Sequence, residues 1–186
     1  MTEPFDAIIL AGAVSRRLGG VDKAMVRIGD RPMLAHVLAA CAAADRRIVV
    51  GPQRRGISAL WCTEDPPGGG PVAAIAAGVA MARAPIAVLL ACDVPYTTAQ
   101  TLRSLVAAMS GDGAILVDED GRDQPLLGAY RVDSLVRALG VLGPPYTGTS
   151  LRELVARLSL SRLPDSTGAG RDCDTWEDVE VARHGG

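Results

Sequence analysis

Short apolar runs of strand length alternate with helix-like segments along most of this chain, and this alternation constrains the fold more than any other feature. Residues 5–11, 47–50 and 86–91 are short and apolar, as strands buried on both faces of a sheet are. The segments 32–44 and 72–83 between them have the length of helices. Strands that alternate with crossover helices form a mostly parallel sheet with helices on both faces.

The second half of the chain adds one exception to the parallel pattern. Residues 114–117 and 125–130 flank Asp120 and Gly121, which predicts a hairpin and one antiparallel member of the sheet. We therefore expect a three-layer, Rossmann-like α/β fold in a single domain spanning residues 1–186. We also expect a strand over 59–63 and helices over 98–109 and 134–139. Two further helices are expected to begin at capping patterns, one at 150–153 and one at 174–177.

Composition excludes several classes of function for this chain of 186 residues. The longest apolar run has strand length and the first residues are polar, so we expect neither a membrane span nor a secretory leader. A net charge of −2 and an aromatic content of 3% do not suit nucleic-acid binding, so the expected partner is a small molecule. The scattered cysteines indicate reduced thiols and a cytoplasmic location: Cys41, Cys62, Cys92 and Cys173.

One basic residue differs from all the others: the chain contains 18 arginines and a single lysine, Lys23. The compact ammonium of lysine and the planar guanidinium of arginine are not interchangeable at a tight site. A compositional bias that left one lysine by chance explains the count equally well. The position of Lys23 must decide between these interpretations. The arginine pairs at 46–47 and 54–55 are expected on solvated edges.

Lys23 closes a glycine-rich loop that follows the first expected strand. Glycines such as Gly12 and Gly19 free backbone amides for close approach, and Arg17 and Lys23 add positive charge. This combination suits the binding of phosphate groups. The spacing is not that of a Walker A loop. A solvated surface loop is the alternative, but turns that follow buried parallel strands usually face ligands.

Asp93 stands just past the carboxyl end of the expected strand at 86–91. Mg²⁺ prefers hard oxygen ligands and is often held by one or two carboxylates together with substrate phosphates and water. Asp93 is therefore the predicted magnesium ligand, and capping of the amides in the following turn is the alternative role. A lysine on phosphate and a carboxylate on the metal together predict chemistry of the phosphoryl-transfer type.

Several motifs, in the right order over nearly the whole chain, resemble one family. Residues 10–23 resemble the L-A-G-G loop of the sugar-nucleotide-like NTP transferases, and the ending at 19–23 is similar to that of the molybdenum cofactor guanylyltransferases, the MobA-like proteins. The other matches are residues 70–75 with G-P-L-A-G-I, 92–96 with C-D-x-P-Y, 123–125 with a segment assigned to the pterin side, and 172–178 with N-x-N-T-P-E-D.

The resemblance implies the nucleotidyltransferase fold and transfer of GMP from GTP to the phosphate of molybdopterin or Mo-molybdopterin, with release of pyrophosphate. It implies Mg²⁺ as cofactor and, as protein partners, molybdenum-insertion proteins or acceptor molybdoenzymes. For the nucleotide, the resemblance implies backbone contacts at Leu10, Ala11, Gly12 and Ala13 and further contacts at Asp65 and Gly70. The implied catalytic residues are Lys23, Arg17 and Asp93, and the implied magnesium ligand is Asp93. The acceptor is implied to bind at Asp123, Gln124 and Pro125.

Departures from the family pattern leave alternatives open. Ala13 stands where the family has a second glycine, which leaves three outcomes open: its Cβ crowds a phosphate or disfavours a positive φ and so weakens binding, the loop shifts, or the substitution is harmless. Asp172 and Asp174 replace asparagines, so Asp174 is either a second magnesium ligand or the N-cap of the last helix. Asp65 is explained equally well as a turn residue before Pro66. The alternative functions are a related transferase that uses CTP or a sugar-phosphate acceptor, and a non-catalytic protein that binds a nucleotide or pterin.

Overall fold

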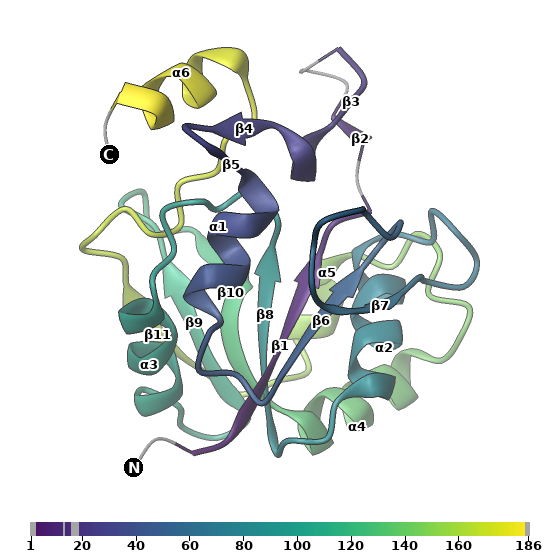
Figure 1. Ribbon diagram of the computed structural model, residues 1–186. Coiled ribbons are helices and arrows are strands. Elements are labelled where there is room, and N and C mark those ends of the chain that lie inside the picture. Colours follow the sequence, from purple (N-terminus) through teal and green to yellow (C-terminus); the bar gives the residue numbers. More distant parts are fainter. Residues whose placement is uncertain (1–2, 13, 16–18, 185–186) are drawn as a thin grey trace.

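A computed structural model describes residues 3–12, 14–15 and 19–184 of the chain. A seven-stranded sheet forms its centre, and six of these strands run in one direction while β10 runs against both of its neighbours (Figure 1). In spatial order the strands are β11 (Leu160–Pro164), β9 (Gly113–Val117), β10 (Asp123–Arg131), β8 (Ile86–Ala91), β1 (Phe5–Leu10), β6 (Arg46–Val50) and β7 (Leu60–Cys62).

Helices cover both faces of this sheet and give the three layers predicted from the sequence. One core cluster joins apolar side chains of β1 and β8 to two helices on one face, and a second cluster joins the opposite side chains of the same strands to three helices on the other face. The helices of the first face are α1 (Met33–Ala40) and α3 (Ala99–Ala107), and those of the second face are α2 (Pro71–Met81), α4 (Val132–Leu142) and α5 (Leu151–Val155).

Small elements cover the carboxyl ends of the parallel strands, at the top of Figure 1. A third apolar cluster packs the last helix against a short ribbon and the start of α1, through Val179, Ile28 and Met33 among others. These elements are α6 (Trp176–His184), the ribbon of β4 (Arg27–Ile28) and β5 (Arg31–Pro32), the ribbon of β2 (Val14–Ser15) and β3 (Val21–Asp22), and the 3-10 turn η1 (Lys23–Met25).

Several boundaries differ from the expectations. The first helix ends at Ala40 rather than at residue 44, because the chain must turn for Asp45 to donate its N–H to the carbonyl of Phe5 and begin β6. The helix α4 continues past the exposed Gly140 to Leu142, and the C-cap Gly143 that follows has a φ of 70°, a left-handed conformation that glycine accommodates. The edge strand β11 is not among the elements expected from the sequence.

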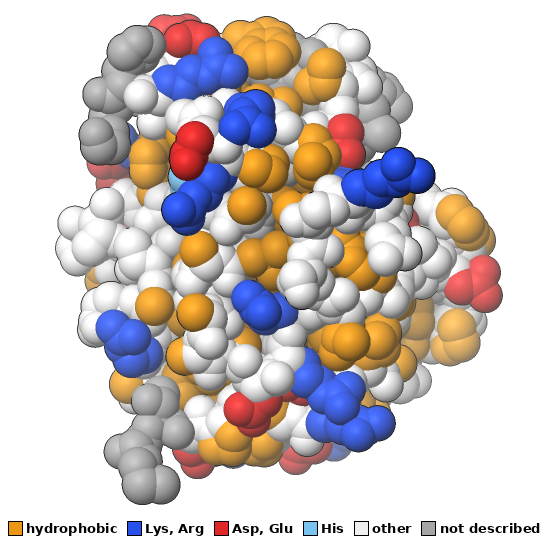
Figure 2. All heavy atoms as spheres, viewed as in Figure 1, with side chains coloured by type: hydrophobic (Ala, Val, Ile, Leu, Met, Phe, Trp, Pro, Cys, Tyr) orange, Lys and Arg blue, Asp and Glu red, His pale blue; other side chains and the backbone are white. Residues whose placement is uncertain are grey.

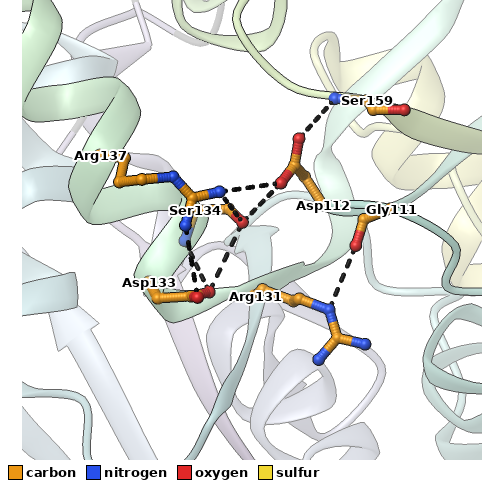
Figure 3. A network of polar contacts seen from close by, with 7 residues as sticks. All are labelled: Gly111, Asp112, Arg131, Asp133, Ser134, Arg137 and Ser159. Carbon is orange, nitrogen blue, oxygen red and sulfur yellow. Dashed lines mark hydrogen bonds and ion pairs between the residues drawn. The ribbon is translucent and has the colours of Figure 1, made fainter.

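A polar network connects the elements at the β11 edge of the sheet (Figure 3). The carboxylate of Asp112 accepts hydrogen bonds from the Ser134 hydroxyl at 2.6 Å, from the Ser159 backbone N–H at 2.8 Å and from the Arg137 guanidinium at 3.2 Å. It thereby joins the turn before β9 to α4 and to the start of β11. The Ser134 bond, followed by the Ser159 bond, lowers the pKa of Asp112 below its ordinary value.

The surface in view in Figure 2 carries basic side chains as separate groups, with acidic and apolar areas between them. On the described part of this face, no continuous basic stripe of the kind that follows a nucleic-acid backbone is present. Within the described ranges, no helix combines the length and the apolar composition needed to cross a bilayer.

Candidate active site

The first site segment lies at the centre of the sheet, where β1 ends between β6 and β8. The Leu10 carbonyl accepts a hydrogen bond from the Cys92 N–H at 3.1 Å, and the Ala11 N–H donates to the Val50 carbonyl at 2.8 Å. Ala11 is buried, and Gly12 emerges at the exposed carboxyl edge. The predicted nucleotide-binding residues Leu10, Ala11 and Gly12 therefore lie where parallel sheets place ligands.

Close backbone packing supports this turn. Gly51, the residue after β6, has a φ of 143°, and a Cβ added to it would lie 2.8 Å from the Ala11 carbonyl carbon. Only glycine accommodates both the backbone conformation and this approach. The packing holds the ends of β1 and β6 together directly behind Gly12.

Arg54 supports the same turn, and the expectation of a solvated edge is wrong for this residue. Its side chain is 8% exposed and donates to the Ala11 carbonyl at 2.7 Å and to the Pro52 carbonyl at 3.0 Å. It also forms a two-bond ion pair with Asp22, at 2.7 and 2.8 Å, and stacks over Trp61. Arg54 thus ties the turn after β1 to the residue before Lys23. The one sequence signal that could have indicated this role is the position of the arginine, three residues after the glycine that ends the strand.

Lys23 is buried, with 5% of its surface exposed, and its ammonium lies between two carboxylates. Its Nζ donates to the Asp93 carboxylate at 2.5 Å and to the carboxylate of Asp174. The lysine begins η1, directly after the β2–β3 ribbon that closes the glycine-rich loop. A buried ammonium between two acids is a specific arrangement, and it favours a specific role for the single lysine over chance.

Asp93 follows β8, and Asp174 arrives from the far end of the chain. The Cys173 N–H donates to the Asp93 carbonyl at 3.0 Å, so a backbone bond fastens the C-terminal segment to the end of the central strand. The Thr97 hydroxyl donates to the Ala169 carbonyl at 3.0 Å and adds a second link. The residues 93 and 174 are therefore held together by backbone contacts as well as by Lys23.

The N-cap predicted at Asp174 is displaced by one residue. Thr175 and Asp178 form the reciprocal cap of α6: the Thr175 hydroxyl accepts from the Asp178 N–H at 3.2 Å, and the Asp178 carboxylate accepts from the Thr175 N–H at 2.7 Å. Of the two roles considered for Asp174, side-chain capping is wrong, and its carboxylate contacts Lys23 instead.

Electrostatics in this cluster follow from burial and charge. Burial lowers the pKa of Lys23, but Asp93 and Asp174 more than offset this and the net pKa lies above its ordinary value. Lys23 is therefore an ammonium at neutral pH. Burial raises the pKa of the neighbouring Asp172 carboxyl, and the like charges of Asp174 and Asp93 raise it further.

The region that follows β7 holds two more predicted nucleotide contacts. Asp65 is exposed, whereas the carboxylate of its neighbour Glu64 accepts from the Gly68 N–H at 3.2 Å and lies above Gly12, 3.6 Å from where a Cβ on Gly12 would be. Gly70 precedes α2 with a φ of 94°, and its carbonyl accepts from the Ala74 N–H at 3.0 Å. Glu64 is not among the site residues predicted from the sequence.

A cavity of about 790 Å³ opens beside the carboxylates. Its lining includes Asp93 and Asp172 together with the predicted acceptor residues Gln124 and Pro125. Asp123 forms a two-bond ion pair with Arg162, both bonds at 2.8 Å, and lines a separate cavity of about 490 Å³ together with Pro125. The structure thus brings Gln124 and Pro125 to the site and turns Asp123 toward Arg162.

The carboxylates suit magnesium in one specific way. Asp93 and Asp174 both present carboxylate oxygens to the Lys23 ammonium, and hard oxygens of this kind are the ligands that Mg²⁺ prefers. In the part of the chain that the structure describes, no group of three His, Cys, Asp or Glu side chains is placed to hold a metal alone. These residues therefore fit a metal that completes its coordination with phosphate oxygens and water.

Two predicted residues, Ala13 and Arg17, lie outside the described residues, so their roles stay predictions.

A mostly parallel sheet with a buried lysine and a carboxylate at its strand ends, beside an open cavity, defines a site of the phosphoryl-transfer class. The family described as "MobA-like NTP transferase domain" matches residues 7–162. The molybdenum cofactor guanylyltransferase of Shewanella loihica is 29% identical over 136 residues, covering 68% of this chain and 69% of that protein. The probable molybdenum cofactor guanylyltransferase of Natronomonas pharaonis is 27% identical and covers 95% of each chain.

Solved structures agree with this match. The crystal structure of molybdopterin-guanine dinucleotide biosynthesis protein A from Archaeoglobus fulgidus has a TM-score of 0.73 at 20% identity, covering 96% of this chain and 97% of that one. The chain belongs to the family of MobA-like NTP transferase domains, and it is a nucleotidyltransferase similar to the molybdenum cofactor guanylyltransferases. The fold and the family resemblance predicted from the sequence are confirmed.

Proposed function

We propose that this protein transfers GMP from GTP to the phosphate of molybdopterin or Mo-molybdopterin and so forms the guanine dinucleotide cofactor. An oxygen of the acceptor phosphate attacks the α-phosphorus of GTP, the bond from that phosphorus to the bridging oxygen breaks, and pyrophosphate leaves. The acceptor is already an anion and needs no general base, so positioning and electrostatics supply most of the rate. The names of the relatives support the choice of nucleotide and acceptor.

The observation that carries the proposal is the convergence of Lys23 and Asp93, which are 70 residues apart in the chain and 2.5 Å apart in space. Their side chains meet where β1 and β8 end, beside the cavity that Gln124 and Pro125 line. A nucleotide bound over Gly12 would bring its phosphates to Lys23, while an acceptor in the cavity would approach from the side of Asp93. Lys23, and Arg17 in the adjoining loop, would neutralise charge on the leaving pyrophosphate.

Magnesium is part of this proposal, with Asp93 as its protein ligand. When bound, the metal would neutralise phosphate oxygens and orient them for in-line displacement. We also propose that the protein acts in the cytoplasm, a location supported by four cysteines that are all free thiols. Molybdenum-insertion proteins and acceptor molybdoenzymes remain the proposed protein partners.

Pyrophosphate release with GTP, Mg²⁺ and molybdopterin tests the reaction, and CTP with the same acceptor tests the alternative donor. We expect pyrophosphate only in the reaction that contains GTP, together with a product that carries both guanosine and pterin. Lys23→Met should lower kcat at least about a hundredfold, because a transition-state charge contact of this kind contributes about 3 kcal/mol. Equal turnover of CTP, or an unchanged kcat in a folded Lys23→Met variant, would contradict the assignment.

A further inference from the structure

We infer that Lys23 occupies the metal position in the nucleotide-free protein, and that Asp174 joins Asp93 as the second carboxylate of the metal site once the nucleotide draws Lys23 away. This inference deepens the proposed function and rests on it for the identity of the nucleotide. It concerns the binding of a divalent cation, which can be measured without any turnover.

The contacts of the ammonium give the first step. Lys23 donates to one oxygen of each carboxylate, Oδ2 of Asp93 and Oδ1 of Asp174. Its side chain is 7% exposed, against 21% for Asp93 and 37% for Asp174, so the carboxylates reach solvent more readily than the cation between them. A divalent cation that approaches these oxygens would be repelled by the positive charge of Lys23 that lies between them.

Charge balance gives the second step. Two carboxylates and one ammonium have a net charge of −1, whereas two carboxylates and one Mg²⁺ are neutral. A monovalent and a divalent cation cannot share the same pair of oxygens at contact distance without strong repulsion. Lys23 must therefore leave before the metal binds, and a triphosphate supplies the anionic oxygens that it would move to. Nucleotide and metal are expected to bind together.

The backbone supplies the third step. The bond from the Cys173 N–H to the Asp93 carbonyl, at 3.0 Å, holds residues 93 and 174 near each other whether or not Lys23 lies between their side chains. Cys173 itself is fully buried in the cluster that packs α6 against Met33. The pair of carboxylates is thus preformed, and Asp174 is a carboxylate where the family pattern has an asparagine.

Binding of Mn²⁺ alone, followed by the loss of its free-ion EPR signal, tests the exchange. The natural protein should bind Mn²⁺ weakly without nucleotide. Lys23→Met, which keeps the length of the side chain and removes the charge, should bind Mn²⁺ at least about tenfold more tightly, equivalent to about 1.4 kcal/mol. An affinity of folded Lys23→Met equal to that of the natural protein would overturn the inference. Because no GTP is present, this result is independent of whether the proposed reaction occurs.

A second measurement remains decisive if Lys23→Met does not fold. With the α,β-methylene analogue of GTP present, the natural protein should bind Mn²⁺ tightly, and Asp174→Asn should weaken that binding about tenfold. Asp172→Asn removes the same charge two residues away and is the matched control, with a much smaller expected effect. Equal losses in both variants would show a general effect of charge, and no loss in Asp174→Asn would remove it from the metal site.

Discussion

At the scale of single residues, the arginine that supports the turn after β1 is as informative as the single lysine of the chain. Arg54 donates to two backbone carbonyls and to both oxygens of Asp22, so its planar group links three segments of chain. Lysine cannot reproduce this, because a single ammonium lacks the fork geometry. Arg54 acts through Ala11 and Asp22, and it is therefore a positioning residue.

Arg54→Lys should lower the free energy of unfolding by about 1 to 3 kcal/mol, because hydrogen bonds of a charged group that is largely buried are lost. It should also raise the Kd for GTP while the nucleotide chemistry itself is retained. Urea unfolding and calorimetric titration measure the two effects. The control is Arg55→Lys at the adjacent exposed position. Similar losses in both variants, or no change in the Kd of Arg54→Lys, would contradict the positioning role.

At the scale of elements, one carboxylate connects three segments at the β11 edge of the sheet. Asp112 connects the turn before β9 to α4 and to β11, and its pKa lies below the ordinary value. A carboxyl whose pKa is lower in the folded state stabilises that state at pH values above the unfolded pKa of about 3.9. This stabilisation is lost as pH falls through the folded pKa.

Asp112→Asn should therefore lower the melting temperature at pH 7 and have a smaller effect near pH 3, which is below the unfolded pKa, so that part of the stabilisation by the natural carboxylate is already lost. Melting curves followed by circular dichroism at the two pH values give the comparison. Asp133→Asn is the control, because Asp133 pairs with the same Arg137 at 3.3 Å but is a largely exposed group. An Asp112→Asn effect that is the same at both pH values would contradict the role of its charge.

At the scale of the whole molecule, one sheet contributes side chains to both main cores, and Met33 at the start of α1 joins the third cluster to the rest. The two tryptophans lie in different parts of the molecule and can serve as separate probes of unfolding. Trp61 is on β7 at one edge of the sheet, and Trp176 is on α6 above the strand ends. Because the two main clusters share strands and the third cluster shares α1 with the first, we predict that the molecule unfolds as a single cooperative unit. The single domain expected from the sequence leads to the same prediction.

Unfolding by guanidinium should therefore give the same midpoint for both tryptophans. The Trp176→Phe variant follows Trp61 alone, and the Trp61→Phe variant follows Trp176 alone. Circular dichroism of each variant corrects for differences in stability. An earlier transition of Trp176 would show that α6 separates first. In that case the C-terminal part of the site, including Asp174, would be a separately unfolding unit.

The amino-acid sequence by itself determined the layers of this protein, because the lengths and apolar character of its strands follow from local periodicity. It also located Lys23 and Asp93 as residues that follow strands, and the family motifs around them. Only the tertiary structure decided which groups face them. Asp174 meets Lys23 across 151 residues, Arg54 turns inward instead of outward, and Asp123 turns to Arg162. Those choices depend on packing between segments distant in the chain, which no local pattern encodes.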